Sequence, residues 1–267
     1  MATKDSKKVE EVKNTHGQRS PTKCNLGRYD LHDACMSGDL EKVKTILDSA
    51  PQRVNARGPK NRTPLHCAAK GDTTAVASYL ISIGADTEAR TAYKMTPLHV
   101  AAFYGSAAVL RFLLEEVEDI DVNALDFGSW TSLHYACNYN WGDCAILLID
   151  YGASLTKKSA ELQLVALHLA ARSGNLPTVE KLIKSGCNVN QRNLFYTTPL
   201  HLACQNDRVE VVLFLLKAGA SPDAPDEAGI TPAQLTKRDD IAQALEEAIK
   251  AAAARRRSAV ALPPPAA

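Results

Sequence analysis

Apolar residues recur along the chain in pairs of short stripes with helical spacing, as in the stretch TPLHLACQNDRVEVVLFLLKAGASPD. The two stripes of this stretch consist of Leu200, Ala203 and Cys204, and of Val211, Val212, Leu215 and Leu216. Thr198 and Pro199 suit the start of the first helix, because a threonine hydroxyl can cap it and proline has no N–H to satisfy there. A polar turn near Asp207 separates the stripes, and Gly219 ends the second. The pattern predicts two helices followed by a polar loop, called a finger below, around residues 222–229.

The same unit recurs at a fixed period. Six of the seven histidines occupy one local frame, in the contexts YDLHDAC, TPLHCAA, TPLHVAA, TSLHYAC, VALHLAA and TPLHLAC. These are His32, His66, His99, His134, His168 and His201, at intervals of 34, 33, 35, 34 and 33 residues. A seventh copy, TPAQLTK, has Gln234 in the histidine position. A constant period near 33 residues with the motif T-P-L-H-x-A is typical of ankyrin repeats. Over about residues 27–250, the chain resembles the ankyrin-repeat family.

The resemblance implies an all-α solenoid of about seven helix–turn–helix repeats, with β-hairpin fingers and flexible tails. We expect the repeat domain to span residues 27–250, between a disordered basic tail at residues 1–26 and an Ala/Arg/Pro-rich tail at residues 251–267. The end repeats of a stack have one uncovered face and should be more polar than the others. Accordingly, the first copy has Tyr29 in place of threonine and the last has Gln234 in place of histidine.

Repeat five departs from the motif inside the array. It begins with Val165 and Ala166 instead of Thr-Pro and follows a long finger with the sequence SLTKKSAELQL. Valine has no hydroxyl to cap a helix, and a missing cap costs about 1 kcal/mol. We therefore predict that the junction of repeats four and five is the weakest interior joint of the array.

Composition and charge limit the cellular compartment and the kind of partner that we expect. The formal net charge is +1, so nucleic acid is not an expected partner. No apolar run is long enough to span a membrane, and the N-terminal sequence MATKDSKKVE does not resemble a secretory signal. Seven cysteines, an odd number in such a chain, favour a reducing compartment. The cytoplasm is the expected location, with the nucleus left open, and no membrane insertion is expected.

The motifs do not predict catalysis, a cofactor or a metal site. The sequence has no glycine-rich phosphate loop, no G-x-S-x-G and no Cys or His pair at metal spacing. The repeated histidines lie on equivalent helices, which pack about 8–10 Å apart, whereas zinc takes nitrogen ligands at about 2 Å. The resemblance implies instead that each imidazole ties the start of its helix to the neighbouring finger by hydrogen bonds. The protein is expected not to be an enzyme.

In ankyrin-like repeats, the variable residues on the fingers and after the LHxAA core form the binding surface. The protein-binding residues predicted on this basis are Arg57, Lys60, Arg62, Lys70, Tyr93, Phe103, Tyr104, Phe127, Trp130 and Tyr139. Exposed aromatic residues are typical of binding hot spots, and Tyr104, Trp130 and Tyr139 are the favoured contacts. Alternatively, aromatic residues fold back onto neighbouring repeats, as expected for Tyr135 and Trp141. The basic residues of repeat two could equally be a solvated face.

Function then depends on a partner. We expect a monomeric, non-enzymatic adaptor or scaffold that binds another protein through the concave face and fingers. The predicted partner is an apolar segment flanked by acidic residues. In the tails, Ser20 in SPTK and Ser258 in RRRS match kinase motifs and are candidate phosphorylation sites.

Two alternative functions remain open. One is a chaperone of proteasome regulatory-particle assembly, because seven repeats and the stretch TPLHLACQNDRVE are similar to the gankyrin group of the family. The L-x-C-x-E motif of that group falls on Leu202 to Asn206, LACQN, where the glutamate is absent. Retinoblastoma binding is therefore not implied. The other alternative is a structural component of a cytoskeletal or flagellar complex.

Overall fold

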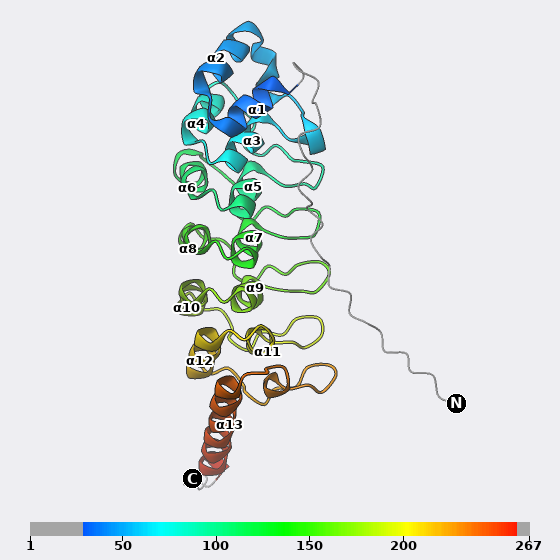
Figure 1. Cartoon of the computed structure of the whole chain (residues 1–267), viewed down its shortest axis with the longest axis vertical. Helices are drawn as coiled ribbons and strands as arrows, with labels where there is room; N and C mark the ends of the chain where they lie inside the picture. The colour runs from blue at the N-terminus through cyan, green and yellow to red at the C-terminus, as the bar shows by residue number, and fades with distance from the viewer. Residues whose placement is uncertain (1–28, 261–267) are drawn as a thin grey trace, which may run out of the picture.

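The computed structural model describes residues 29–260, with only the backbone for residues 255–260. Its helices stack in pairs along one column, and the fingers project from one side of that column (Figure 1). The predicted all-α repeat architecture is confirmed. The first helices of repeats one to six are α1 (Asp30–Ser37), α3 (Pro64–Gly71), α5 (Pro97–Tyr104), α7 (Ser132–Asn138), α9 (Ala166–Ser173) and α11 (Pro199–Gln205). The second helices are α2 (Leu40–Ser49), α4 (Thr74–Ser82), α6 (Ala107–Glu116), α8 (Gly142–Asp150), α10 (Leu176–Lys184) and α12 (Val209–Lys217).

Repeat seven differs from the others. It consists of a 3-10 turn, η3 (Pro232–Gln234), and the long helix α13 (Asp239–Val260), which continues into the predicted C-terminal tail. Two further 3-10 turns, η1 (Pro51–Asn55) and η2 (Pro59–Asn61), lie between α2 and α3. The leucine before each motif histidine is fully buried and forms the centre of the stack. Among residues 29–260, no helix combines the length and the apolar character that crossing a membrane would require.

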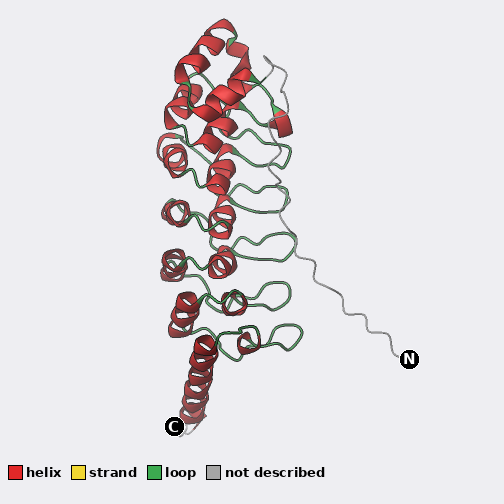
Figure 2. Ribbon diagram, viewed as in Figure 1, coloured by secondary structure: helices red, strands yellow, loops and turns green. Residues whose placement is uncertain are grey.

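The fingers are not the β-hairpins predicted from the sequence, because residues 29–260 contain no strand (Figure 2). Each finger closes through two backbone bonds. In finger three, the N–H of Thr91 donates to the carbonyl of Met95 at 3.0 Å, and the N–H of Lys94 donates to the carbonyl of Thr91 at 2.9 Å. The Thr91 hydroxyl also accepts the N–H groups of Tyr93 and Met95, at 3.3 and 3.1 Å. In finger three, the Thr91 side chain thus takes the amide of Met95, which would otherwise complete a ladder pair with the carbonyl of Thr91.

Successive fingers are joined at their tips by single backbone bonds. The N–H of Ala92 donates to the carbonyl of Lys60 at 2.9 Å, and the N–H of Phe127 donates to that of Tyr93 at 3.0 Å. The same bond joins Ala160 to Gly128, Leu194 to Leu162 and Glu227 to Phe195. Pro59 occupies the equivalent donor position of finger two and has no N–H to donate. Within the described residues, this tip ladder therefore begins at finger two.

The motif histidines bind successive repeats together, as the resemblance implied. His99 is buried; its Nδ1 accepts the N–H of Thr96 at 3.2 Å, and its Nε2 donates to the carbonyl of Trp130 at 3.1 Å. The equivalent Nε2 atoms bond to the carbonyls of Met95 (His66), Leu164 (His134), Thr197 (His168) and Ile230 (His201). Since both ring nitrogens are occupied, these imidazoles are structural. Among the described residues, no group of His, Cys, Asp and Glu side chains could hold a metal ion.

The end repeats modify this arrangement. In repeat one, Tyr29 replaces the capping threonine, and the buried Nδ1 of His32 has no hydrogen-bond partner. In repeat seven, the Oε1 atom of Gln234 accepts the N–H of Thr231 at 2.8 Å, as a histidine Nδ1 does elsewhere. Gln234 thus preserves the hydrogen bond to the N-cap residue, although the segment forms a 3-10 turn rather than an α-helix.

We predict that Val165→Thr stabilises the array. The N–H of Val165 still donates to Nδ1 of His168 at 3.3 Å, but valine offers no oxygen to the first turn of α9. A threonine hydroxyl should add about 1 kcal/mol to the free energy of unfolding, measured by urea denaturation. Hydrogen exchange should show the α7–α9 junction opening before its neighbours in the wild type and becoming more protected in the variant. Equal protection of all interior junctions in the wild type would refute the weak-joint prediction.

The buried histidines predict that stability decreases in mild acid. Burial lowers the pKa of His66 and of His168 to about 4, against about 6.5 in an unfolded chain. The unfolded state then binds more protons, so the stabilisation is complete above pH 6.5 and is lost progressively as the pH falls toward 4. Each of these two histidines should cost about 2 kcal/mol at pH 5. Urea unfolding at pH 7 and pH 5 measures the loss, and His66→Gln should reduce it; equal stability at both pH values would contradict the prediction.

Candidate protein-binding groove

A groove lies between the fingers and the first helices of repeats two to five. Its cavity volume is about 810 Å³. It brings together nine of the ten sequence-predicted binding residues, all except Arg57. These nine are Lys60, Arg62, Lys70, Tyr93, Phe103, Tyr104, Phe127, Trp130 and Tyr139. The remaining lining residues are Met95, Val100, Asp126, Gly128, Tyr135, Ala160 and Glu161.

Five aromatic rings form a connected cluster in the groove. The Phe103 ring lies 4.9 Å from that of Tyr104, 5.4 Å from that of Tyr135 and 4.7 Å from that of Tyr139, between centroids. The Trp130 ring lies 5.1 Å from that of Tyr135. Tyr104 and Tyr139 are exposed, whereas the other three are half-buried. The cluster is therefore both an extension of the core and an apolar surface that a partner can reach, which combines the two interpretations of the sequence.

Asp126 connects this cluster to finger four. Its Oδ2 atom accepts the hydroxyl of Tyr135 at 2.5 Å, and its Oδ1 atom accepts the N–H groups of Gly128 and Trp130, each at 2.8 Å. Burial raises the pKa of Tyr135, and the bond to Asp126 raises it further. The phenol therefore stays protonated and donates to the carboxylate, which fixes Trp130 against the floor of the groove.

Basic side chains lie over aromatic rings along one part of the groove. The Nζ atom of Lys60 is 5.6 Å from the centroid of the Tyr93 ring, and that of Lys70 is 5.2 Å from the Tyr104 ring. Beside the groove, Lys94 lies 5.2 Å from the ring of Phe127, which is 72% exposed. These lysines and Arg62 form no ion pair with a carboxylate of the described residues. The positive charge is therefore available to a ligand.

Arg57, the predicted residue outside the groove, holds two fingers together. Its guanidinium donates to the carbonyls of Asn61 at 3.3 Å and Arg90 at 2.9 Å. Trp141 also has a connecting role: its Nε1 atom donates to the carbonyl of Phe103 at 3.1 Å, as expected for a ring that folds back. Of the two candidate phosphorylation sites, Ser20 lies outside the described residues. Ser258 belongs to α13, in a part of the helix where only the backbone is described.

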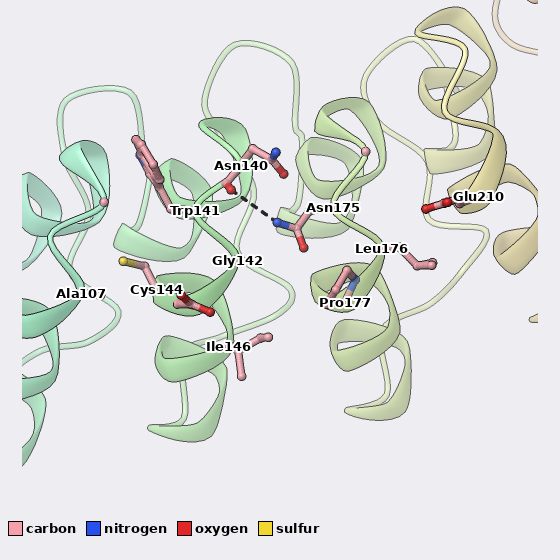
Figure 3. A pocket seen from close by; sticks show the side chains of 13 residues that line it. Ala107, Asn140, Trp141, Gly142, Cys144, Ile146, Asn175, Leu176, Pro177 and Glu210 are labelled. Atoms are coloured by element: carbon pink, nitrogen blue, oxygen red, sulfur yellow. Dashed lines mark hydrogen bonds between the residues drawn. The ribbon is translucent and has the colours of Figure 1, made fainter.

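A second, smaller cavity lies at the turns between the helices of repeats three to six, with a volume of about 460 Å³. Figure 3 shows Asn175 on its wall, with its Nδ2 atom donating to the carbonyl of Asn140 at 3.4 Å. The acidic residues Asp143 and Glu210 contribute to the lining, and none of the predicted binding residues does. The larger groove is therefore the candidate site.

The repeat pattern did not predict the polar part of the groove, Asp126 and Glu161. A signal for Asp126 exists in the sequence, because Asn193 and Asp226 occupy the same position in their fingers and accept the same turn amides. Glu161 carries no comparable signal, since finger five has an extra residue and its own tip geometry.

Comparison with known proteins agrees with this architecture. The family model for ankyrin repeats matches residues 31–126, 93–159, 117–193 and 163–226. A yeast (Saccharomyces cerevisiae) protein described as a probable 26S proteasome regulatory subunit p28 is 29% identical over 183 residues, which cover 66% of this chain and 78% of that protein. The ankyrin-repeat domain of Bcl-3 has a TM-score of 0.70 at 25% identity and covers 82% of this chain and 99% of that domain. The human ASB11 ankyrin-repeat domain has a TM-score of 0.71 at 25% identity, with 93% and 100% covered.

The chain therefore belongs to the ankyrin-repeat family. Members of this family generally bind other proteins and are typically non-enzymatic.

We predict that Tyr135→Phe destabilises the protein by about 1.5–3 kcal/mol, the value of a hydrogen bond to a charged group. The change removes the hydroxyl that donates to Asp126 and leaves that carboxylate oxygen without its partner. Tyr139→Phe is the matched control, because Tyr139 is exposed, and it should change stability by less than about 0.5 kcal/mol. Urea unfolding of both variants measures the difference, and equal stabilities would show that the Asp126–Tyr135 bond does not support the groove.

Proposed function

We propose that this protein is a non-enzymatic adaptor that binds a partner protein through the groove of repeats two to five. The observation that supports this function most directly is the combination of a connected ring cluster with lysines that have no carboxylate partner. Tyrosine and tryptophan bury a large area with few rotatable bonds, which suits them to protein contacts. The fixed turn of finger four reduces the ordering cost of binding.

The chemistry of the groove favours an apolar partner segment flanked by acidic residues. Apolar side chains would cover Phe103 and Trp130, while carboxylates would pair with Lys60 and Lys70. A basic segment is disfavoured, because it would meet these lysines and Arg62. The groove is a local feature of a chain with net charge +1, so we do not propose nucleic acid as its ligand.

A second candidate function is assembly of the proteasome regulatory particle. The observation that favours it is the resemblance to the yeast protein described as a probable proteasome regulatory subunit. On this proposal, the partner is a proteasomal subunit, and the protein acts as a monomer in the cytoplasm and nucleus. The L-x-C-x-E departure at Leu202 to Asn206 leaves retinoblastoma binding outside the proposal. A cytoskeletal or flagellar role has no specific observation in its favour.

We predict that Tyr104→Ala, Trp130→Ala and Tyr139→Ala together abolish capture of the partner from native lysate. A matched control is Ile83→Ala, Tyr151→Ala and Leu213→Ala, which removes exposed apolar side chains from outside the groove. Circular dichroism must show that both triple variants fold. Proteins captured by the wild type and the control, but not by the groove variant, are the partners.

Lys60→Glu with Lys70→Glu provides a second test, because charge reversal on the wall leaves the ring cluster in place. This variant should lose the same proteins. Proteasomal subunits among them would support the second candidate function. Identical captures by the wild type, the groove variant and the charge-reversed variant would contradict groove binding altogether.

A further inference from the structure

Finger six presents three consecutive apolar side chains outside the groove. Leu194, Phe195 and Tyr196 are 46%, 47% and 51% exposed. The turn that carries them is fixed, because the Oδ1 atom of Asn193 accepts the N–H groups of Phe195 at 3.0 Å and Thr197 at 2.8 Å. A fixed loop thus leaves about half of each of these three apolar side chains exposed to solvent.

The backbone at Tyr196 is strained. Its φ angle is 57°, in the left-handed region that glycine tolerates and a bulky side chain does not favour. Ten non-glycine residues of the described chain have positive φ, and Tyr196 is the only aromatic one. Finger seven has Gly229 at the equivalent position, and finger four has Ser129. Strain of this kind gathers at functional sites, which indicates that Tyr196 is present for its side chain.

Finger six repeats the chemistry of the groove. The guanidinium carbon of Arg192 lies 5.5 Å from the centroid of the Tyr196 ring. Arg192, like Lys60 beside Tyr93, forms no ion pair with a carboxylate of the described residues. Aromatic rings with an available positive charge therefore occur at two places along the fingers, at the groove and at finger six. Finger five, with Ala160 and Glu161 at its tip, separates the two places.

The two places are continuous along the tip ladder. The N–H of Leu194 donates to the carbonyl of Leu162 at 3.0 Å, and Leu162 follows Glu161 on the groove wall. Four repeat steps of about 8–10 Å separate finger two from finger six. An extended chain rises about 3.3 Å per residue, so roughly 10–12 residues would cover both places. One linear segment can therefore occupy them together.

We propose that finger six is a second contact site for the partner segment that fills the groove. The segment places one apolar residue with an acidic neighbour on the ring cluster of the groove, and repeats that pair on Phe195 and Tyr196. The residues of the segment between the two pairs are not acidic, because they would lie against the carboxylate of Glu161. This inference rests on the proposed function of the groove and adds the extent and the charge pattern of its partner.

A library of random 20-residue peptides displayed on phage, selected on the full chain, tests the proposal. Peptides that Lys60→Glu with Lys70→Glu no longer retains depend on the groove. Calorimetry then compares their Kd for the wild type, Tyr196→Gly and the control Asp119→Gly, which changes a positive-φ residue outside the groove. Tyr196→Gly should raise the Tm, because it relieves the strain, and should weaken binding about fivefold or more, the loss of one aromatic contact. Asp119→Gly should leave the Kd unchanged.

The outcomes separate the two proposals. Groove-dependent peptides whose Kd is unchanged by both Tyr196→Gly and Phe195→Ser would overturn the second contact site and leave the groove standing. A selection without any groove-dependent peptide would instead overturn the proposed function. Support for the second site requires that both finger-six variants weaken binding and that the enriched peptides carry two apolar–acidic pairs.

Discussion

One backbone carbonyl in each finger accepts two hydrogen bonds, and the stack depends on it. The carbonyl of Trp130 accepts the N–H of Asp126, which closes finger four, and also the Nε2–H of His99 from the preceding repeat. Both lone pairs of one oxygen are thus used to shape a finger and to place it against its neighbour. Because the His99 imidazole is buried, water could not replace this carbonyl if the bond were lost.

The hydrogen bonds that hold the repeats together also hold the residues of the groove in place. Trp130 contributes its carbonyl to the bond with His99 and its ring to the cluster with Tyr135. The same residue therefore joins the repeat framework to the binding surface. Asp126 has a similar double role, since its carboxylate accepts the N–H of Trp130 in the turn and the hydroxyl of Tyr135 in the ring cluster. The rings are held by bonds that the fold needs in any case, so a partner meets a surface that is already formed.

The period of the sequence was sufficient to predict the fold and most of the groove, because equivalent positions of stacked repeats lie beside one another in space. Lys70 and Phe103 occupy one such position, which is why residues 33 apart share a wall. The period does not predict features that depend on individual side-chain hydrogen bonds. The Thr91 hydroxyl takes the N–H of Met95, and the Arg57 guanidinium spans two fingers rather than facing the groove. Periodicity describes which face a residue occupies, but not which of several acceptors its side chain finds.

The proline of finger two has a consequence for association between molecules. Pro59 has no donor for the tip ladder, while the carbonyl of Ala228, at the acceptor position of finger seven, accepts no tip bond among the described residues. A second copy placed head to tail would bring these two positions together without a hydrogen bond. Open-ended contacts of this kind generate filaments when they are complementary, and an unprotected edge invites them. A head-to-tail contact through the fingers would therefore lack the backbone bond that joins each pair of neighbouring fingers within the chain.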